Sequence, residues 1–146
     1  MSDESTLTGR VQIWPLLIEY WQDHKWFGSG FGSFWNIQGS QPIEGFTHGW
    51  ISEIASAHNG FLDLVVQTGL PGLILAILAT LIAPLYRLLS GTQIERSRAC
   101  LLLAILCFCL GHNITESSLF DRDAVPQVFL MLGIGLLNAE WWKARV

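Results

Sequence analysis

A histidine stands in a short polar stretch, Ala57-His58-Asn59-Gly60, immediately before a long apolar run. An imidazole titrates near neutral pH, so His58 beside a polar cluster of Asn59, Asp63 and Glu53 could act as a general base toward a hydroxyl group. A histidine with a purely structural role is the alternative, and the residue types by themselves leave both open.

A glycine-rich turn, Phe27-Gly28-Ser29-Gly30-Phe31-Gly32-Ser33-Phe34, precedes this stretch. The backbone N–H groups around Gly28, Gly30 and Gly32 could approach an anion such as a phosphate. A nucleotide-binding Rossmann loop is excluded, because that motif follows a strand and this turn follows a predicted helix. A flexible connector without a ligand is the other interpretation.

Aromatic residues are concentrated in the first part of the chain. Residues 1–61 hold eleven of the seventeen Trp, Tyr and Phe residues. Aromatic rings with one polar edge favour the membrane interface, and they also stack on sugar rings. Both interpretations apply to this segment.

Two further patterns point to metal chemistry only weakly. Asp121-Arg122-Asp123 has the Asp-x-Asp form with which many glycosyltransferases bind a metal and a nucleotide sugar, but no α/β nucleotide-binding pattern surrounds it. The three cysteines, Cys100, Cys107 and Cys109, lie within one apolar run without metal-ligand spacing. We therefore predict no metal site, no cofactor and no disulfide.

The composition is that of a membrane protein. Of the 146 residues only 14% are charged and 51% are hydrophobic, and the mean hydropathy is +0.40. Soluble domains carry roughly 25% charged residues. The net charge of −4 and the absence of a basic run make nucleic acid an unlikely partner.

Three apolar segments predict transmembrane helices at about 64–86, 99–114 and 124–142. The stretch Gly69-Leu70-Pro71-Gly72 could kink the first helix or mark the end of a surface helix. We expect an all-α integral membrane helix bundle, in which a loop segment, residues 1–61, precedes a membrane segment, residues 62–146.

The positive charges predict the orientation. Five of the eight Lys and Arg residues lie between the first two spans or after the third. The positive-inside rule makes that side cytoplasmic, together with the C-terminus, and places residues 1–61 on the extracytoplasmic side. Because residues 1–10 lack the pattern of an export signal, we expect further spans upstream in a longer protein.

The loop segment is expected to consist of short surface helices and glycine-rich loops. The segment from Arg10 to Trp26 has apolar residues at helical spacings of three and four. These residues are Val11, Trp14, Leu17, Ile18 and Trp21. This spacing predicts an amphipathic helix that lies on the bilayer surface with Arg10 at its start.

Three blocks of the chain together resemble the C-terminal part of the bacterial O-antigen ligase and polymerase family. The first is Thr8-Gly9-Arg10-Val11-Gln12-Ile13-Trp14 with the glycine-rich turn. The second is Ala57-His58-Asn59 with Gly69-Leu70-Pro71-Gly72, and the third is Thr115-Glu116-Ser117-Ser118-Leu119. Their order and spacing are more specific than any one block.

The resemblance implies a multi-pass protein of the bacterial inner membrane and a metal-independent glycosyltransferase. Such enzymes transfer a glycan from an undecaprenyl-diphosphate carrier to a hydroxyl group of an acceptor, which is a second glycan, a lipid A core or a similar molecule. The protein is also expected to contact membrane lipid. The resemblance assigns His58 as general base and Arg10 as the group that binds diphosphate. For substrate binding we add Gly28, Gly30, Gly32 and Asn59, with Trp14 as an aromatic platform for sugar and Glu116 as either a catalytic acid or a salt-bridge partner.

Two other functions remain open from the sequence. One is a module that binds or transports a lipid-linked glycan without chemistry, and the other is a non-catalytic truncated fragment of such an enzyme. The predicted spans hold no ionisable residue at mid-depth, which favours the enzyme or the fragment over a transporter.

Overall fold

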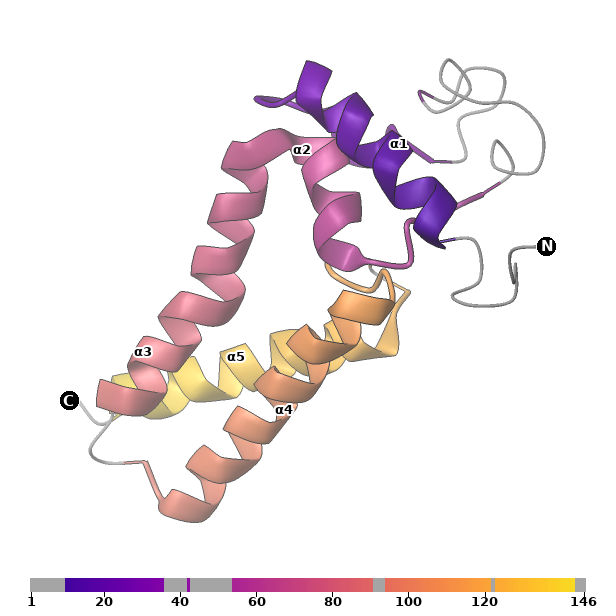
Figure 1. The fold of residues 1–146 in the computed structure, drawn as a ribbon. Coiled ribbons are helices and arrows are strands. Elements are labelled where there is room, and N and C mark those ends of the chain that lie inside the picture. Colours follow the sequence, from indigo (N-terminus) through magenta and orange to yellow (C-terminus); the bar gives the residue numbers. More distant parts are fainter. Residues whose placement is uncertain (1–9, 36–41, 43–53, 91–93, 122, 144–146) are drawn as a thin grey trace.

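The computed structural model describes residues 10–35, 42, 54–90, 94–121 and 123–143 (Figure 1). These residues form helices and connecting loops without a strand, as predicted. The helices are α1 (Arg10–Asp23), α2 (Gly60–Ile77), a π-helical turn η3 (Leu78–Ile82), α3 (Ala83–Ser90), α4 (Arg96–Thr115) and α5 (Val125–Lys143).

Helix α2 changes direction sharply at Gly69, where φ is 69° and ψ is −172° (Figure 1). The residues before the break, Gly60 to Thr68, form a short helix beside α1. From Leu70 the chain runs as one long helix through η3 and α3 to Ser90. The predicted kink at this glycine is confirmed, and the long helix begins after it rather than at Leu64.

Glycine is required at this break for two reasons. A left-handed φ is unfavourable for residues with a Cβ, and a Cβ on Gly69 would lie 2.4 Å from the carbonyl carbon and oxygen of Trp26. Pro71 then falls in the first turn of the long helix, where its missing N–H costs little.

The glycine-rich turn supplies the hydrogen bonds that the broken helix lacks. Ser29 N donates to Val66 O over 3.0 Å, and Gly30 N donates to Gln67 O over 2.8 Å. Leu70 N, at the start of the long helix, donates to Lys25 O over 2.7 Å. Backbone groups that a helix end would leave unpaired are therefore satisfied by the chain that follows α1.

Helix α1 packs against the short helix of α2. Ile13, Leu17 and Tyr20 are buried there with Val65 and Val66. Much of the apolar face predicted for α1 thus packs against protein, and its position on the bilayer surface stays a prediction. The predicted face is also rotated, because Ile18 is exposed.

A second core joins α2, α4 and α5. Its buried members include Leu64, Ala76, Leu106, Cys109 and Leu130. The two last helices make extensive contact, and Gly133 of α5 lets Ile105 of α4 approach closely, since an added Cβ would lie 3.3 Å from its side chain.

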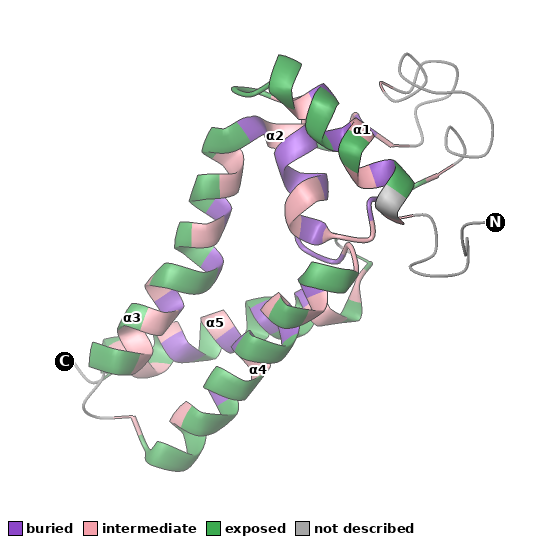
Figure 2. Cartoon of the chain, viewed as in Figure 1, coloured by how far each residue is buried: buried purple, intermediate pink, exposed green. Residues whose placement is uncertain are grey.

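Two helical segments in the described part of the chain are long and apolar enough to cross a membrane, Gly60–Ser90 and Arg96–Thr115. Their outward faces carry exposed apolar side chains such as Leu75, Leu101 and Phe108 (Figure 2). The third predicted span corresponds to α5, a 19-residue helix that is not among these two. That the chain has three transmembrane spans, and where each span begins and ends, remain predictions.

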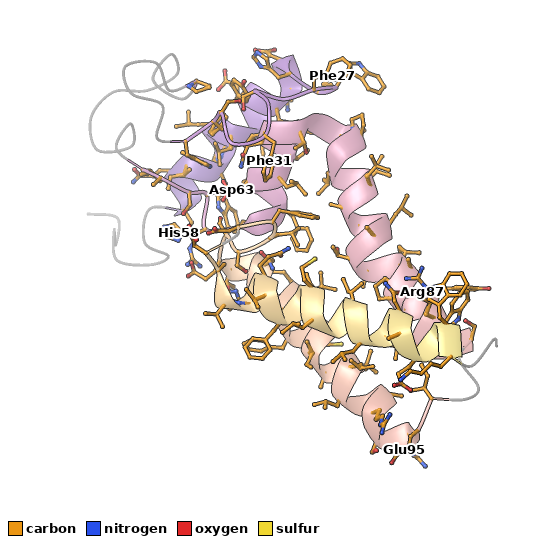
Figure 3. The ribbon with its side chains drawn as sticks, turned by 180° about the vertical axis from the view of Figure 1, so that it is seen from behind. Phe27, Phe31, His58, Asp63, Arg87 and Glu95 are labelled. Atoms are coloured by element: carbon orange, nitrogen blue, oxygen red, sulfur yellow. The ribbon has the colours of Figure 1, made fainter. Side chains whose placement is uncertain are left out.

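Polar contacts tie α3, α4 and α5 together at one end of the bundle. Arg87 hydrogen-bonds Asn138 and lies over the ring of Trp141 at 5.5 Å, and Arg98 lies 3.4 Å from Glu140. Arg87 and Glu95 lie at the opposite end of the structure from His58 and Asp63 (Figure 3).

Candidate functional site: a carboxylate between an arginine and a histidine

Three separate elements bring the site together. Arg10 is the first residue of α1, His58 lies in the loop that leads into α2, and Glu116 follows the last turn of α4. The packing of α1 on α2 and of α2 on α4 places these three side chains at one end of the bundle.

Glu116 bridges the two predicted catalytic residues. Its Oε1 accepts a hydrogen bond from Arg10 Nη2 over 3.1 Å, and its Oε2 lies 3.2 Å from His58 Nδ1. The Arg10 side chain is 19% exposed, whereas His58 and Glu116 are 43% and 45% exposed. The structure thus brings together three predicted site residues and places Glu116, for which a salt bridge to an arginine was one predicted role, between Arg10 and His58.

The electrostatics keep Glu116 ionised. The hydrogen bond from His58 lowers the pKa of the Glu116 carboxyl from its ordinary value of 4.5, against a smaller opposing effect of burial. The positive charges of a protonated His58 and of Arg10 act in the same direction as the hydrogen bond. Because an ionised carboxylate can only accept, Nδ1 of a neutral His58 must carry the proton, which leaves the lone pair on Nε2.

The backbone around His58 is held in an uncommon conformation. Its φ of 50° is left-handed, a region in which Asn, Asp and His are enriched among non-glycine residues. Asn59 follows as the N-cap of α2, and its side chain accepts from the backbone N–H groups of Phe61 and Leu62. Because it caps α2, Asn59 helps to position His58. Its predicted role in substrate binding stays a prediction.

Further hydrogen bonds lock the histidine loop to the end of α4. Asn59 N donates to Ser117 Oγ over 3.0 Å, Asn59 Nδ2 donates to Ile114 O over 3.1 Å, and Gly60 N donates to Glu116 O over 3.1 Å. The distance between His58 and Glu116 is consequently set by backbone contacts and not by the ion pair alone.

Gly60 and Asn113 make this close approach possible. A Cβ on Gly60 would lie 2.2 Å from Asn113 Oδ1. Buried Asn113 uses that oxygen to accept from both N and Oγ of Ser118, while its Nδ2 donates to Cys109 O. Asn113 therefore stabilises the turn that the Thr-Glu-Ser stretch forms after α4.

Trp14 lies on the other side of the same loop. Its Nε1 donates to Ala57 O over 2.9 Å, and its ring packs partly buried against the core of α1 and α2. This contact positions the residue before His58. The sugar-platform role predicted for Trp14 stays a prediction.

The three predicted glycines lie away from His58, at the far end of the short helix. Gly28 N donates to His24 O, Gly30 N to Gln67 O, and Gly32 N to the side-chain Oε1 of Gln67. All three N–H groups are therefore occupied within the chain, and the connector interpretation of this turn agrees with the geometry. An anion-binding role for the glycines remains a prediction that these contacts do not support.

Asp63 is a residue of this region that the sequence pattern did not identify as part of the site. The sequence places it near His58 but predicts no role of its own for it. Its Oδ1 accepts from Trp35 Nε1 over 2.7 Å and from Ala57 N over 3.0 Å, although it lies in an otherwise apolar helix. A single carboxylate in such a helix is the signal that could have identified it, because a buried charge needs partners.

Metal ligands do not gather in the part of the chain that the structure describes. No group of three or more His, Cys, Asp or Glu side chains there could hold an ion. Asp121 instead accepts from the backbone N of Asp123 in a turn between α4 and α5, while Arg122 lies outside the described residues.

The comparisons with known proteins agree with this arrangement. The chain is similar to the exopolysaccharide production protein ExoQ of Rhizobium meliloti (strain 1021), with 39% identity over 75 residues. That alignment covers 49% of this chain and 17% of the relative, so the chain spans a small part of the relative's length. No solved structure matches the chain.

The sequence model of the O-antigen ligase family matches residues 1–77, a range that holds α1, the glycine-rich turn, Arg10 and His58. The resemblance seen in the three sequence blocks is thereby confirmed for the two blocks within this range. Two of its helices are long and apolar enough to cross a membrane, and the chain belongs to the O-antigen ligase family.

Proposed function

We propose that this chain carries the catalytic histidine and a phosphate-binding arginine of a glycosyltransferase of the O-antigen ligase or polymerase type. The observation that carries the proposal is the Glu116 carboxylate, which binds Arg10 with one oxygen and His58 with the other. The family match supports the class of reaction. The donor is a glycan on an undecaprenyl-diphosphate carrier, and the acceptor is a hydroxyl of a second glycan, a lipid A core or a similar molecule.

His58 acts as the general base in this proposal. The acceptor hydroxyl oxygen attacks the anomeric carbon of the donor sugar, and its proton passes to His58 Nε2. Glu116 on Nδ1 keeps the ring in the tautomer that presents a lone pair at Nε2, and it stabilises the imidazolium that forms. The contact that the structure shows for the His58 ring uses Nδ1, and the proposal assigns Nε2 to the substrate.

Arg10 stabilises the leaving group. As the bond between the anomeric carbon and the phosphate oxygen breaks, its electron pair remains on the lipid diphosphate, whose negative charge grows. A guanidinium carries five N–H donors in a planar fork, so one bond to Glu116 leaves others for phosphate oxygens. The arginine therefore serves both the carboxylate and the departing anion.

The location follows from the same chemistry. A lipid-linked donor must be met at a membrane surface, and the site lies at the end of α4 and not within it. We place this end at the outer face of the bacterial inner membrane, in a multi-pass protein whose C-terminus is cytoplasmic, as the distribution of positive charges predicts.

The test is replacement of His58 by Asn in the full-length protein, expressed in cells that lack their own enzyme. Asn tolerates the left-handed backbone at this position, so the variant removes the base while keeping the loop. We expect transfer to fall by about 10²- to 10⁴-fold, the usual contribution of a general base. Surface glycan on a gel and transfer to an acceptor in vitro are the readouts.

Glu116→Gln tests the orienting role in the same assay. The amide cannot hold His58 in one tautomer as a carboxylate does, and a loss of about 10- to 100-fold is expected. Normal transfer by membrane-inserted His58→Asn protein would overturn the assignment of His58 as general base. If the wild-type protein bound lipid-linked glycan but transferred none, a binding or transport module would be the explanation.

A further inference from the structure

A polar cavity of about 220 Å³ lies beside the Glu116 network. Its walls come from the glycine-rich turn, the short helix of α2 and the loop between α4 and α5. Three aromatic side chains line it, Phe31, Trp35 and Phe120, together with polar groups that include Asp63 and Ser117. Ser117 directly follows Glu116 in the chain, so the cavity and the proposed catalytic group share one loop.

Two of the lining side chains are held rigidly. Trp35 donates its Nε1 to Asp63 over 2.7 Å and packs edge-on against buried Phe34, with ring centroids 4.7 Å apart. Asp63 also accepts a hydrogen bond from Ala57 N over 3.0 Å. A pocket whose walls are fixed before binding loses little conformational entropy when a ligand enters.

The hydrogen-bond capacity of Asp63 is not exhausted. A carboxylate offers about four acceptor positions, and the hydrogen bonds to Asp63 in the described part of the chain come from Trp35 and Ala57, with both donors on Oδ1. Asp63 is only 8% exposed and lies in the wall of the cavity. A remaining acceptor position can therefore be used by a donor that occupies the cavity.

We infer that this cavity binds one sugar ring of the substrate. A pyranose has a face of C–H groups that stacks on an aromatic ring and an edge of hydroxyl groups that donate to a carboxylate, and the cavity supplies both. Its volume is below the roughly 300–1,000 Å³ of pockets for drug-sized ligands, which fits a single ring. The inference rests on the proposed glycosyl transfer and adds where a sugar is held.

Phe31 is the side chain that tests this inference most directly. It is 65% exposed at the rim, so its removal should leave the fold intact. Phe27, in the same turn and 83% exposed, does not line the cavity and provides a matched control. Figure 3 shows Phe27 at the far end of the turn region and Phe31 nearer to Asp63.

The experiment measures binding of free D-glucose, D-galactose, D-mannose and N-acetyl-D-glucosamine by saturation-transfer NMR. The full-length protein is held in lipid nanodiscs, since many detergents carry sugars themselves. We expect at least one sugar to bind the wild type and His58→Asn equally, with about tenfold weaker binding to Phe31→Ala and no change for Phe27→Ala. Binding of none of these sugars, or equal losses in both phenylalanine variants, would overturn the inference.

Steady-state transfer separates the two possible sources of the sugar. Phe31→Ala should raise KM by about tenfold for the lipid-linked donor or for the acceptor, with kcat little changed, and the substrate affected is the one whose ring the cavity holds. An unchanged KM for both substrates would contradict the inference. If His58→Asn binds sugar normally and also transfers glycan normally, the proposed catalytic role fails while the sugar pocket stands.

Discussion

At the scale of single residues, Glu116 determines what the site can do. Sequence reasoning left two roles open for it, a salt bridge or a catalytic role, and the structure shows the salt bridge to Arg10 together with a contact to His58. A carboxylate that binds both residues at once couples the imidazole of His58 to the guanidinium of Arg10. The ionisation of Glu116 should therefore be visible in the stability of the protein as well as in its activity.

The first prediction concerns this ionisation. The pKa of Glu116 is lowered in the folded protein, so its contribution to stability is present above the ordinary value of 4.5 and is lost as the pH falls below it. At neutral pH we expect Glu116→Gln to lower Tm by about 1 to 4 °C, a small effect because the pair is partly exposed. This difference should shrink as the pH falls below 4.5 and vanish once the pH lies below the lowered pKa of Glu116 in the folded protein.

Thermal unfolding of the purified protein across pH 3.5 to 7.5 checks this prediction. Glu19→Gln removes an exposed carboxylate on α1 and is the matched control. A constant offset between wild type and Glu116→Gln at all pH values would mean that the Glu116 charge does not stabilise the fold.

At the scale of elements, the break in α2 is the feature on which the site depends. The short helix, Gly60 to Thr68, carries Asp63, is capped by Asn59 and packs on α1, whereas the long helix from Leu70 belongs to the bundle. If the two parts formed one straight helix, this arrangement could not form. The residues of the glycine-rich turn maintain the break by pairing its exposed backbone groups.

The second prediction is that Gly69→Ala destabilises the protein strongly. The left-handed φ costs about 1 to 2 kcal/mol for a residue with a Cβ, and contact with the Trp26 carbonyl adds to it. We expect a loss of about 2 to 4 kcal/mol in the free energy of unfolding. Denaturation of the purified protein in detergent gives the measurement.

Gly111→Ala is the matched control for this change. Gly111 lies inside α4, and an added Cβ meets no other atom within 4 Å. The alanine should leave stability unchanged or raise it by up to about 1 kcal/mol through helix propensity. Equal effects of the two substitutions would show that the break tolerates an ordinary residue.

At the scale of the whole molecule, the two ends of the bundle differ in character. One end holds Arg10, His58 and Glu116, and the other holds Arg87, Arg98 and other charged residues that tie α3, α4 and α5 together. This separation agrees with the orientation that the positive charges predict. It gives a direct way to test on which side of the membrane the site lies.

The third prediction is that the end with His58 faces outward. In a background of Cys100→Ala, Cys107→Ala and Cys109→Ala, we expect Phe27→Cys to react with a membrane-impermeant maleimide in intact spheroplasts. Ser97→Cys, exposed at the start of α4, should react only after the membrane is permeabilised. The reverse pattern of labelling would place the catalytic end in the cytoplasm.

Local features of the sequence were enough to predict much of this protein. Long uncharged runs predicted helices because a bilayer favours helices in which backbone groups pair internally. The stretch from Gly69 to Gly72 predicted a kink because its residue types disfavour a continuous helix. Arg10, His58 and Glu116 were singled out from their residue types together with the family resemblance.

Tertiary structure decided which of these residues meet. Glu116 lies 106 positions from Arg10 and 58 from His58, and no local spacing encodes a contact over such separations. The packing face of α1, the use of the glycine-rich turn to hold a broken helix, and the cavity beside Asp63 likewise depend on how helices pack. The sequence determined the elements, because their patterns are local, whereas the site arose only when those elements packed together.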